Sequence, residues 1–341
     1  MSNVTDALNE SIRVEVVGLL SGYAFSAKTT VSMLSESENK IFLINDPARS
    51  ENYVARVNSG RLVYHTQEMI DSEMAWLQAI RSDTDVTVPA VLSDNNGTIV
   101  HQLHLPLSDT TRFMAVYSFL PGVEPPEGHL DSGFRQLGEV TAQLNLHTRS
   151  WEIPEGFQRP TWTAEAILDD TYGWGHWKDG VCVDSDVLSL LIRAETTILH
   201  RAEQFPRDRS NFGLIHADLR LANVLVDGDN TAIIDFDDCG FGWYIYELAA
   251  ALSFLEERPD IQNLIKSWHA GYRKLSEISN DLIEEFPTFL LLRRLKLLGW
   301  VGYQQRNLAF AREIGPKFTA DTCDLASEYI KRYSHNRPSS R

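Results

Sequence analysis

The chain changes character near residue 120. Short runs typical of β-strands dominate the first third, whereas most of the remainder shows the periodicity of helices. Pro121-Gly122 interrupts both patterns, and Pro and Gly are frequent up to residue 128. The sequence therefore predicts an α+β fold with two lobes: a β-rich lobe of residues 1–120 with one main helix, and a mostly helical lobe of residues 121–341. A length of 341 residues is sufficient for two such lobes.

The expected elements follow from the spacing of apolar residues. In the first lobe we predict strands at residues 14–20, 29–34, 40–44, 52–57, 97–103 and 112–119, and one helix at residues 67–81. In the second lobe we predict helices at residues 134–147, 187–201 and over most of 261–333. A hairpin interrupts them, because Asp227-Gly228 separates two apolar runs, 223–226 and 231–234.

Charge limits the partners of the chain. Asp and Glu number 47 against 31 Lys and Arg, so the net charge is −16. Uniform affinity for nucleic acid or for an anionic membrane needs basic surface, so neither is an expected partner. A small or cationic partner remains open.

The cysteines, the N-terminus and the apolar stretches favour a cytoplasmic location. The three cysteines are far apart, form no CxxC pair, and do not indicate a disulfide framework. The N-terminus lacks the basic and apolar regions of a signal peptide. The most apolar stretch, residues 289–303, contains Arg293, Arg294 and Lys296, which argues against a membrane span.

The densest chemistry lies around the hairpin, in His216-Ala-Asp-Leu-Arg-Leu-Ala-Asn223 and Ile234-Asp-Phe-Asp-Asp238. If residues 227–230 form the turn, Asn223 and Asp235 emerge at the same end of the hairpin, with Asp218 a short loop away. Two carboxylates and an amide oxygen are hard ligands of the kind Mg²⁺ prefers. Phosphoryl transfer needs such a metal and a carboxylate that orients the attacking hydroxyl. The alternative is an acidic hairpin loop without catalytic function.

An HxDxxxxN pattern followed by a DFx triplet, here LIHADLRLANVLVDGDNTAIIDFDD, resembles the protein-kinase-like phosphotransferase superfamily. Within it, the sequence is most similar to the aminoglycoside phosphotransferase and choline–homoserine kinase branch, including the RdoA-type stress-response Ser/Thr kinases. The resemblance implies ATP and Mg²⁺ as cofactors, Asp218 as catalytic base, and Asn223 and Asp235 as metal ligands. It also implies that Arg220 lies near the transferring phosphate, although many small-molecule kinases lack a basic residue there.

The first lobe offers an independent indication. Glu73 lies in the middle of the apolar stripe of the helix at residues 67–81, so its carboxylate needs a partner. Arg56 on the preceding strand is the candidate. The superfamily pairs a strand cation with a helix carboxylate to hold the α- and β-phosphates, and here arginine replaces its lysine. The alternative is a salt bridge with a structural function alone.

Two further nucleotide contacts rest on the resemblance. The loop at residues 21–28 would close over the phosphates, through backbone amides that include those of Tyr23 and Ser26. It lacks a GxGxxG pattern, which makes the signal weak. The segment with Ser118 and Leu120 would be the hinge whose backbone meets the adenine, or merely the end of a strand.

The acceptor is less defined. Residues 151–178 carry four tryptophans together with Asp169 and Asp170. These groups would either bind a cationic amine or pack the segment onto the lobe. Asp237 and Asp238 would bind a second metal ion or an acceptor amine, or would form a solvated turn.

The sequence therefore predicts a kinase that phosphorylates a hydroxyl of a small, amine-bearing acceptor. A Ser/Thr protein kinase is the alternative within the same class, and a nucleotide-binding pseudokinase is the alternative of another class. The sequence does not distinguish ATP from GTP and does not indicate an oligomeric state.

Overall fold

The computed structural model describes residues 2–36, 38–49, 51–106, 110–126, 128, 130–228 and 230–334. The chain divides into two compact units. The N-terminal unit comprises Met1–Glu124, Glu152–Arg159 and Val224–Asp237, and the C-terminal unit comprises Pro125–Trp151, Pro160–Asn223 and Asp238–Arg341. The predicted α+β class is confirmed by an antiparallel sheet in the first unit and mostly helices in the second.

An antiparallel sheet forms the centre of the N-terminal unit. Its order is β1-β2-β3-β6-β4, and β5 pairs with the β6 strand as well. The strands are β1 Thr30–Glu36, β2 Lys40–Asn45, β3 Asn52–Val57, β4 Val91–Leu92, β5 Val100–Leu103 and β6 Arg112–Ser118. Alternation along β3 buries one face of the strand in the core and directs Arg56 to the other.

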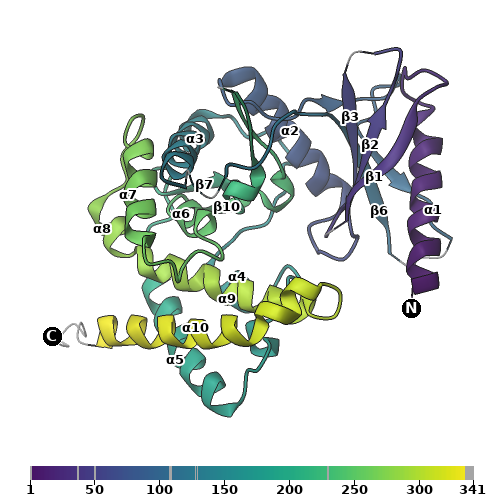
Figure 1. Cartoon of the computed structure of the whole chain (residues 1–341). Helices are drawn as coiled ribbons and strands as arrows, with labels where there is room; N and C mark the ends of the chain where they lie inside the picture. The colour runs from purple at the N-terminus through teal and green to yellow at the C-terminus, as the bar shows by residue number, and fades with distance from the viewer. Residues whose placement is uncertain are drawn as a thin grey trace. The chain divides into compact units, whose positions relative to one another are not determined.

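The first helix differs from the sequence prediction. Residues 14–20, expected as a strand, form the end of helix α1, Ser2–Leu20, which lies beside the sheet in Figure 1. Ile12, Val16 and Leu20 recur every fourth residue and are buried against the sheet, whereas Val14 is exposed. The helical period of this stripe outweighs the β propensity of its valines. The unit therefore has a second substantial helix besides the single one expected.

Helix α2, Gln67–Asp83, begins where Thr66 caps it: the Thr66 hydroxyl accepts a hydrogen bond from the amide of Met69. Its buried side chains include Ile70, Trp76 and, between them, Glu73. The capped start and the apolar stripe agree with the prediction for residues 67–81, and together they place a carboxylate inside the unit.

The predicted hairpin is present, with strands β8 Val224–Asp227 and β9 Asn230–Ile233. Val224 pairs with Ile233 and Val226 with Thr231, which is the expected register. Asp227 and Asn230 form the last pair before the turn. A bridge between Thr87 and Ala232 attaches the hairpin to the rest of the N-terminal unit.

The C-terminal unit is helical, with one additional pair of strands, β7 Phe212–Ile215 and β10 Gly240–Trp243. Its helices are α3 Leu130–Ser150, α4 Ala164–Leu168, α5 Ser185–Ala202, α6 Tyr246–Ala251, α7 Ile261–Tyr272, α8 Asn280–Glu284, α9 Phe286–Gln304 and α10 Ala309–Ser334. Single 3₁₀ turns lie at η2 Trp177–Asp179, η3 Leu221–Asn223 and η4 Phe236–Asp238.

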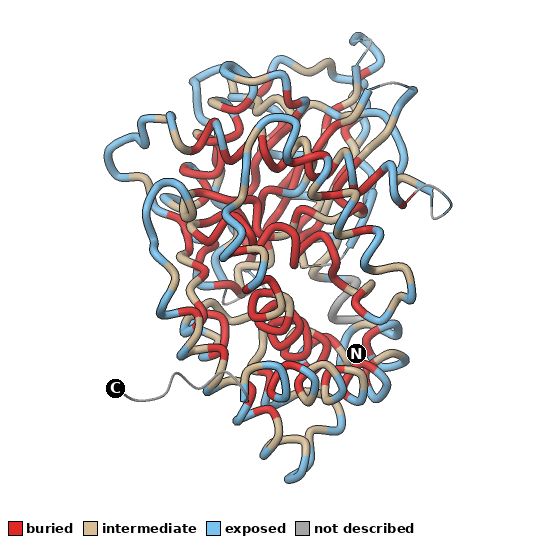
Figure 2. Tube along the Cα trace, turned by 90° about the vertical axis from the view of Figure 1, so that its left-hand side faces the viewer, coloured by how far each residue is buried: buried red, intermediate tan, exposed pale blue. Residues whose placement is uncertain are grey.

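Close helix contacts organise this unit. Helices α3 and α7 cross at glycine, because a Cβ on Gly138 would lie 1.9 Å from the carbonyl oxygen of Trp268. Helices α9 and α10 lie side by side in Figure 1. Figure 2 shows that buried residues follow the strands and helices, while many connecting loops are exposed. No helix in the described part of the chain combines the length and hydropathy of a membrane span.

Candidate active site

A buried ion pair joins β3 to α2 in the N-terminal unit. The two terminal nitrogens of Arg56 donate to the two carboxylate oxygens of Glu73 at 2.8 and 2.6 Å. Arg56 is 8% exposed and Glu73 is fully buried. The guanidinium carbon of Arg56 also lies 5.4 Å from the ring centre of Tyr117 on β6. The predicted pairing of Arg56 with Glu73 is thus present, and its contact with a nucleotide stays a prediction.

Asp237 is a second carboxylate beside Arg56. One oxygen lies 3.8 Å from a guanidinium nitrogen of Arg56. The other accepts hydrogen bonds from Asn39 at 2.9 Å and lies 3.0 Å from Nε2 of His65. Burial alone raises the pKa of Asp237, but attraction to His65 and Arg56 outweighs it and holds the pKa far below its ordinary value. Asp237 is therefore neither a solvated turn residue nor open to an acceptor amine.

In the C-terminal unit, three groups hold the carboxylate of Asp218. One oxygen accepts a hydrogen bond from the buried guanidinium of Arg293 on α9. The other accepts from the side-chain amide of Asn223 at 3.0 Å and lies 3.6 Å from Nε of Arg220. Asn223 also donates to the backbone carbonyl of Asp218 at 2.8 Å. The structure therefore brings together three of the predicted residues and adds Arg293.

This arrangement fixes the charge and the direction of Asp218. Its side chain is 17% exposed, whereas that of Arg293 is 1% exposed. Burial alone raises the pKa of Asp218, but attraction to Arg293 and Arg220 outweighs it and holds the pKa below its ordinary value. The carboxylate is thus ionised and can accept a hydrogen bond from a hydroxyl group. Arg220 is 37% exposed and extends a positive charge toward solvent from the same place.

A buried carboxylate supports the loop before Asp218. His216 follows β7 and is fully buried. Its amide donates to Oε1 of Glu247 at 2.6 Å, and its Nδ1 lies 3.4 Å from the amide of Asp218. Ala217, between them, has a φ of 65°, which is uncommon for a residue with a side chain. Burial raises the pKa of Glu247 to about 7. Glu247 lies in the first turn of α6 and is 1% exposed, so it fixes this loop from inside the unit.

The two predicted metal ligands lie in different units. Asn223 ends the turn η3 and is 6% exposed. Both hydrogen bonds of its side chain use the amide nitrogen, which leaves the amide oxygen to act as a ligand. Asp235 is exposed, follows β9, and has a φ of 66°. Among the described residues, no three His, Cys, Asp or Glu side chains form a cluster that could hold a metal alone.

The loop expected over the phosphates uses its own amides. The amide of Tyr23 donates to the carbonyl of Leu20 at 3.0 Å. That of Ser26 donates to the carboxylate of Asp46 at 2.9 Å, and the Ser26 hydroxyl donates to the same group at 2.5 Å. The ring of Tyr23 is buried in the core. These two amides are therefore occupied by protein acceptors, and the structure gives Tyr23 and Ser26 structural contacts instead of the expected open ones.

Only some of the backbone amides at the end of β6 and just after it are hydrogen-bonded within the protein. The amide of Ser118 donates to the carbonyl of Ala90 at 2.8 Å, and that of Phe119 donates to the carbonyl of Asn52 at 3.0 Å. The Ser118 hydroxyl accepts from the amide of Ala90 at 2.9 Å. The amide of Leu120 makes no hydrogen bond within the described part of the chain. Of the two residues predicted for the hinge, Leu120 is thus the one with a donor available.

The tryptophans of residues 151–178 have separate surroundings. Trp177 is buried and its indole nitrogen donates to Glu195 at 3.1 Å, so it packs the segment against α5. Trp162 and Trp174 instead face the ammonium group of Lys296 on α9. Burial lowers the pKa of Lys296 to about 7, while the indole faces favour its charged form. Two of the rings expected to bind an amine therefore hold one that belongs to the chain.

The sequence did not indicate a function for Arg293 or Lys296, and it did not predict the partners of Asp237. For the two basic residues a signal was present, since a helix buried on every side cannot carry cations without partners. For Asp237 there was no local signal, because its partners His65 and Asn39 are 172 and 198 residues away.

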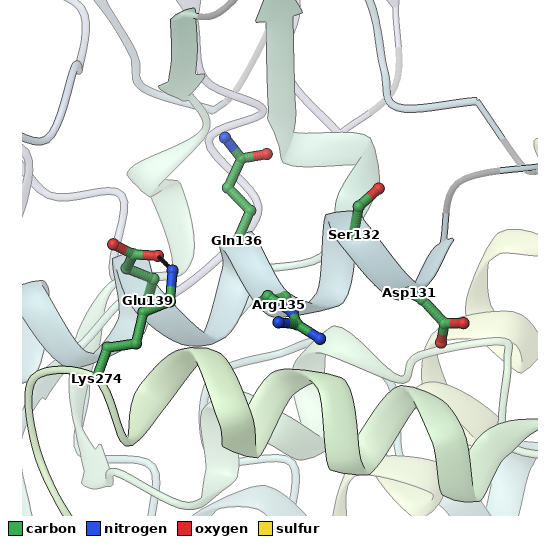
Figure 3. A pocket seen from close by; sticks show the side chains of 6 residues that line it. All are labelled: Asp131, Ser132, Arg135, Gln136, Glu139 and Lys274. Atoms are coloured by element: carbon green, nitrogen blue, oxygen red, sulfur yellow. Dashed lines mark hydrogen bonds and ion pairs between the residues drawn. The ribbon is translucent and has the colours of Figure 1, made fainter.

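A hollow of about 520 Å³ lies elsewhere on the C-terminal unit, on α3 and just after α7 (Figure 3). Glu139 and Lys274 form an ion pair of 2.6 Å on it, with both side chains exposed. The hollow is lined by Asp131, Ser132, Arg135, Gln136, Glu139 and Lys274. None of these residues is among those predicted for the site.

Comparison with known proteins agrees with this chemistry. Residues 31–278 match the phosphotransferase enzyme family. Among solved structures, the chain is similar to a microcompartment-associated aminopropanol kinase with 35% identity and a TM-score of 0.83. That match covers 92% of this chain and 96% of the other.

Two amicoumacin kinases are more distant relatives. The enzyme of Bacillus subtilis (strain 168) is 23% identical over 290 residues, which cover 81% of each protein. The structure of the amicoumacin kinase hAmiN in complex with AMP-PNP, Ca²⁺ and Ami is 21% identical with a TM-score of 0.76. It covers 95% of this chain and 96% of the other, and it supports the fold.

Proposed function

Because the chain belongs to the phosphotransferase enzyme family, we propose that it transfers the γ-phosphoryl group of ATP to a hydroxyl group of a small amino alcohol. The observation that carries the proposal is the carboxylate of Asp218, ionised and held by Arg293 and Asn223. The similarity to an aminopropanol kinase supports an amino alcohol as acceptor class.

Asp218 acts as the base in this reaction. It accepts the hydrogen bond of the acceptor hydroxyl and directs its oxygen toward the γ-phosphorus. As the new P–O bond forms, the bond from the γ-phosphorus to the bridging oxygen breaks and ADP leaves. The hydroxyl proton passes to Asp218. Because Arg293 lowers its pKa, Asp218 contributes more by orienting the hydroxyl than by basicity. Arg220 adds positive charge for the transferring group.

Asn223 and Asp235 are the proposed Mg²⁺ ligands. Asn223 precedes Val224, which pairs with Ile233, and Asp235 follows two residues after Ile233, so the hairpin register supports their use together. An amide oxygen and one carboxylate leave further positions for phosphate oxygens, as Mg²⁺ requires. When bound, Mg²⁺ neutralises phosphate charge.

The nucleotide contacts predicted for the N-terminal unit differ in the structural support that they receive. Arg56 is a cation held between Glu73 and Asp237, and we assign it to the α- and β-phosphates with Glu73 as its positioning partner. The amide of Leu120 is the proposed adenine contact. Ser118, Tyr23 and Ser26 receive no such support, because their amides are already hydrogen-bonded.

The test compares Asp218→Asn with Asp186→Asn, an exposed aspartate on α5. Release of ADP would be followed with 1-amino-2-propanol, a matched diol and a mixture of proteins as acceptors. We expect Asp218→Asn to lower kcat with the amino alcohol by about 100- to 10,000-fold. Binding of Mg²⁺-ATP, measured by calorimetry, should be retained in both variants, and Asp186→Asn should turn over like wild type.

Three outcomes would contradict the proposal. Unchanged turnover of Asp218→Asn would remove Asp218 from the catalytic step. Phosphorylation of a protein without phosphorylation of any amino alcohol would favour the Ser/Thr protein kinase alternative. Nucleotide binding without transfer to any acceptor would favour the pseudokinase alternative.

A further inference from the structure

Helix α9 carries three cations inside the C-terminal unit. It is buried on nearly all sides, and Arg293, Arg294 and Lys296 are each at most 4% exposed. Arg293 is paired with Asp218, and Arg294 donates to the carboxylate of Glu256 at 2.8 Å. Nζ of Lys296 has no hydrogen-bond partner among the described residues. A buried ammonium without an acceptor is costly, so this lysine needs another explanation.

Two indole rings enclose the ammonium group. Nζ of Lys296 lies 3.8 Å from the ring centre of Trp162 and 3.7 Å from that of Trp174. Both distances are well within the range in which a cation is attracted to an aromatic face. A pair of aromatic faces around an ammonium group is also the arrangement with which proteins bind quaternary ammonium ligands. We name this pair of rings with its lysine the tryptophan cage.

The cage is held by contacts on both sides. Trp162 is 2% exposed, and its indole nitrogen donates to the carbonyl of Asp238 at 2.8 Å. Trp174 is carried by a loop that touches α9, since a Cβ on Gly299 would lie 1.9 Å from the carbonyl oxygen of Gly175. Gly299 is three residues after Lys296, so the loop presses on the helix one turn from the lysine. The two rings are therefore built into the unit around this position.

The cage lies beside the proposed base. Lys296 and Arg293 are three residues apart and face the same side of α9. The guanidinium carbon of Arg293, whose nitrogen binds Asp218, is 6.0 Å from the ring centre of Trp174. The charges that act on Lys296 are those of Asp238, Asp218 and Asp170, which attract it, and of Arg293, which repels it.

We infer that Lys296 determines the acceptor specificity of the enzyme by occupying, with its own ammonium group, the aromatic cage that would otherwise bind a cationic acceptor. The inference rests on the proposed function. A quaternary ammonium has no N–H and depends on aromatic faces, which Lys296 has already taken. A primary amine can instead donate hydrogen bonds to carboxylates such as those of Asp170 and Asp238. The enzyme therefore accepts primary amino alcohols and rejects quaternary ones such as choline.

The first test needs no turnover. Tetramethylammonium would be titrated into the full-length protein by calorimetry, with Mg²⁺-ATP thermal shift as the check of folding. We expect binding to Lys296→Ala, in which the cage is open, and none to wild type. Lys274→Ala removes a lysine from an exposed site and should behave like wild type. Binding to wild type, or none to a folded Lys296→Ala, would overturn the inference.

The second test measures specificity. The ratio of kcat/KM for choline to that for 1-amino-2-propanol should rise about tenfold or more in Lys296→Ala and stay constant in Lys274→Ala. Should Lys296→Ala not fold, wild type alone decides: n-propylamine should inhibit competitively and tetramethylammonium should not. Equal inhibition by the two would refute the assignment. If no acceptor is phosphorylated, the proposed function fails, whereas the titration still reports on the cage.

Discussion

The ion pair between Arg293 and Asp218 allows the site and the stability of the unit to be tested separately. Arg293 donates to Asp218, to the Ser253 hydroxyl at 2.9 Å and to the Ala217 carbonyl at 3.2 Å, all from a side chain that is 1% exposed. Arg293→Met leaves Asp218 without its counter-charge. Removing one partner of a buried pair costs about 3–5 kcal/mol, which corresponds to a fall of roughly 10 °C in melting temperature for units of this size.

The adjacent residue provides the matched control. Arg294 is 2% exposed in its side chain and donates to the fully buried carboxylate of Glu256, but it does not contact Asp218. Arg294→Met should therefore destabilise the protein by about the same amount. Only Arg293→Met should lower kcat of the folded enzyme, by about 100-fold, because Asp218 loses its orientation.

Both quantities can be measured on the same preparations. Calorimetric melts report stability, and initial rates at a temperature well below both transitions report kcat of the folded protein. Equal losses of kcat in the two variants would show that α9 acts through stability alone. A folded Arg293→Met with wild-type kcat would refute the assignment of Arg293 as the positioning residue of the base.

Two further variants test the buried carboxylates of Glu73 and Glu247. Glu73→Gln should lower the free energy of unfolding in urea by about 1–3 kcal/mol, because Arg56 loses its hydrogen-bonded carboxylate and keeps only Asp237 at 3.8 Å. It should also raise KM for ATP more than KM for the acceptor, and equal changes in both KM values would contradict this. Burial raises the pKa of Glu247 in the folded protein from its ordinary value of 4.5 to about 7. The folded state therefore has its full stability below pH 4.5, where Glu247 is neutral, and loses part of it as the pH rises to about 7. The melting temperature of Glu247→Gln should therefore rise relative to that of wild type between pH 4.5 and 7. A difference in melting temperature that does not change with pH would exclude this titration.

The parts of the fold that were predictable depend on local pattern. The register of the hairpin followed from Asp227-Gly228 between two apolar runs, and α2 followed from the spacing of its apolar residues. The pairing of Arg56 with Glu73 was predictable because a carboxylate in an apolar stripe has few ways to be satisfied. The strand predicted at residues 14–20 was wrong, because Val16 and its neighbours fit either a strand or a helix until the sheet that they cover is known.

Sequence by itself therefore determined the class of chemistry, through the spacing of Asp218, Asn223 and Asp235 around one hairpin. Tertiary structure decided how the groups are used. Arg293 reaches Asp218 across 75 residues, and Lys296 on the same helix fills the tryptophan cage. The physical reason is that a buried charge is costly without a partner, and the sequence around the charge does not identify that partner. A cation in an apolar helix indicates that a partner exists, and only the packing of distant segments identifies the partner.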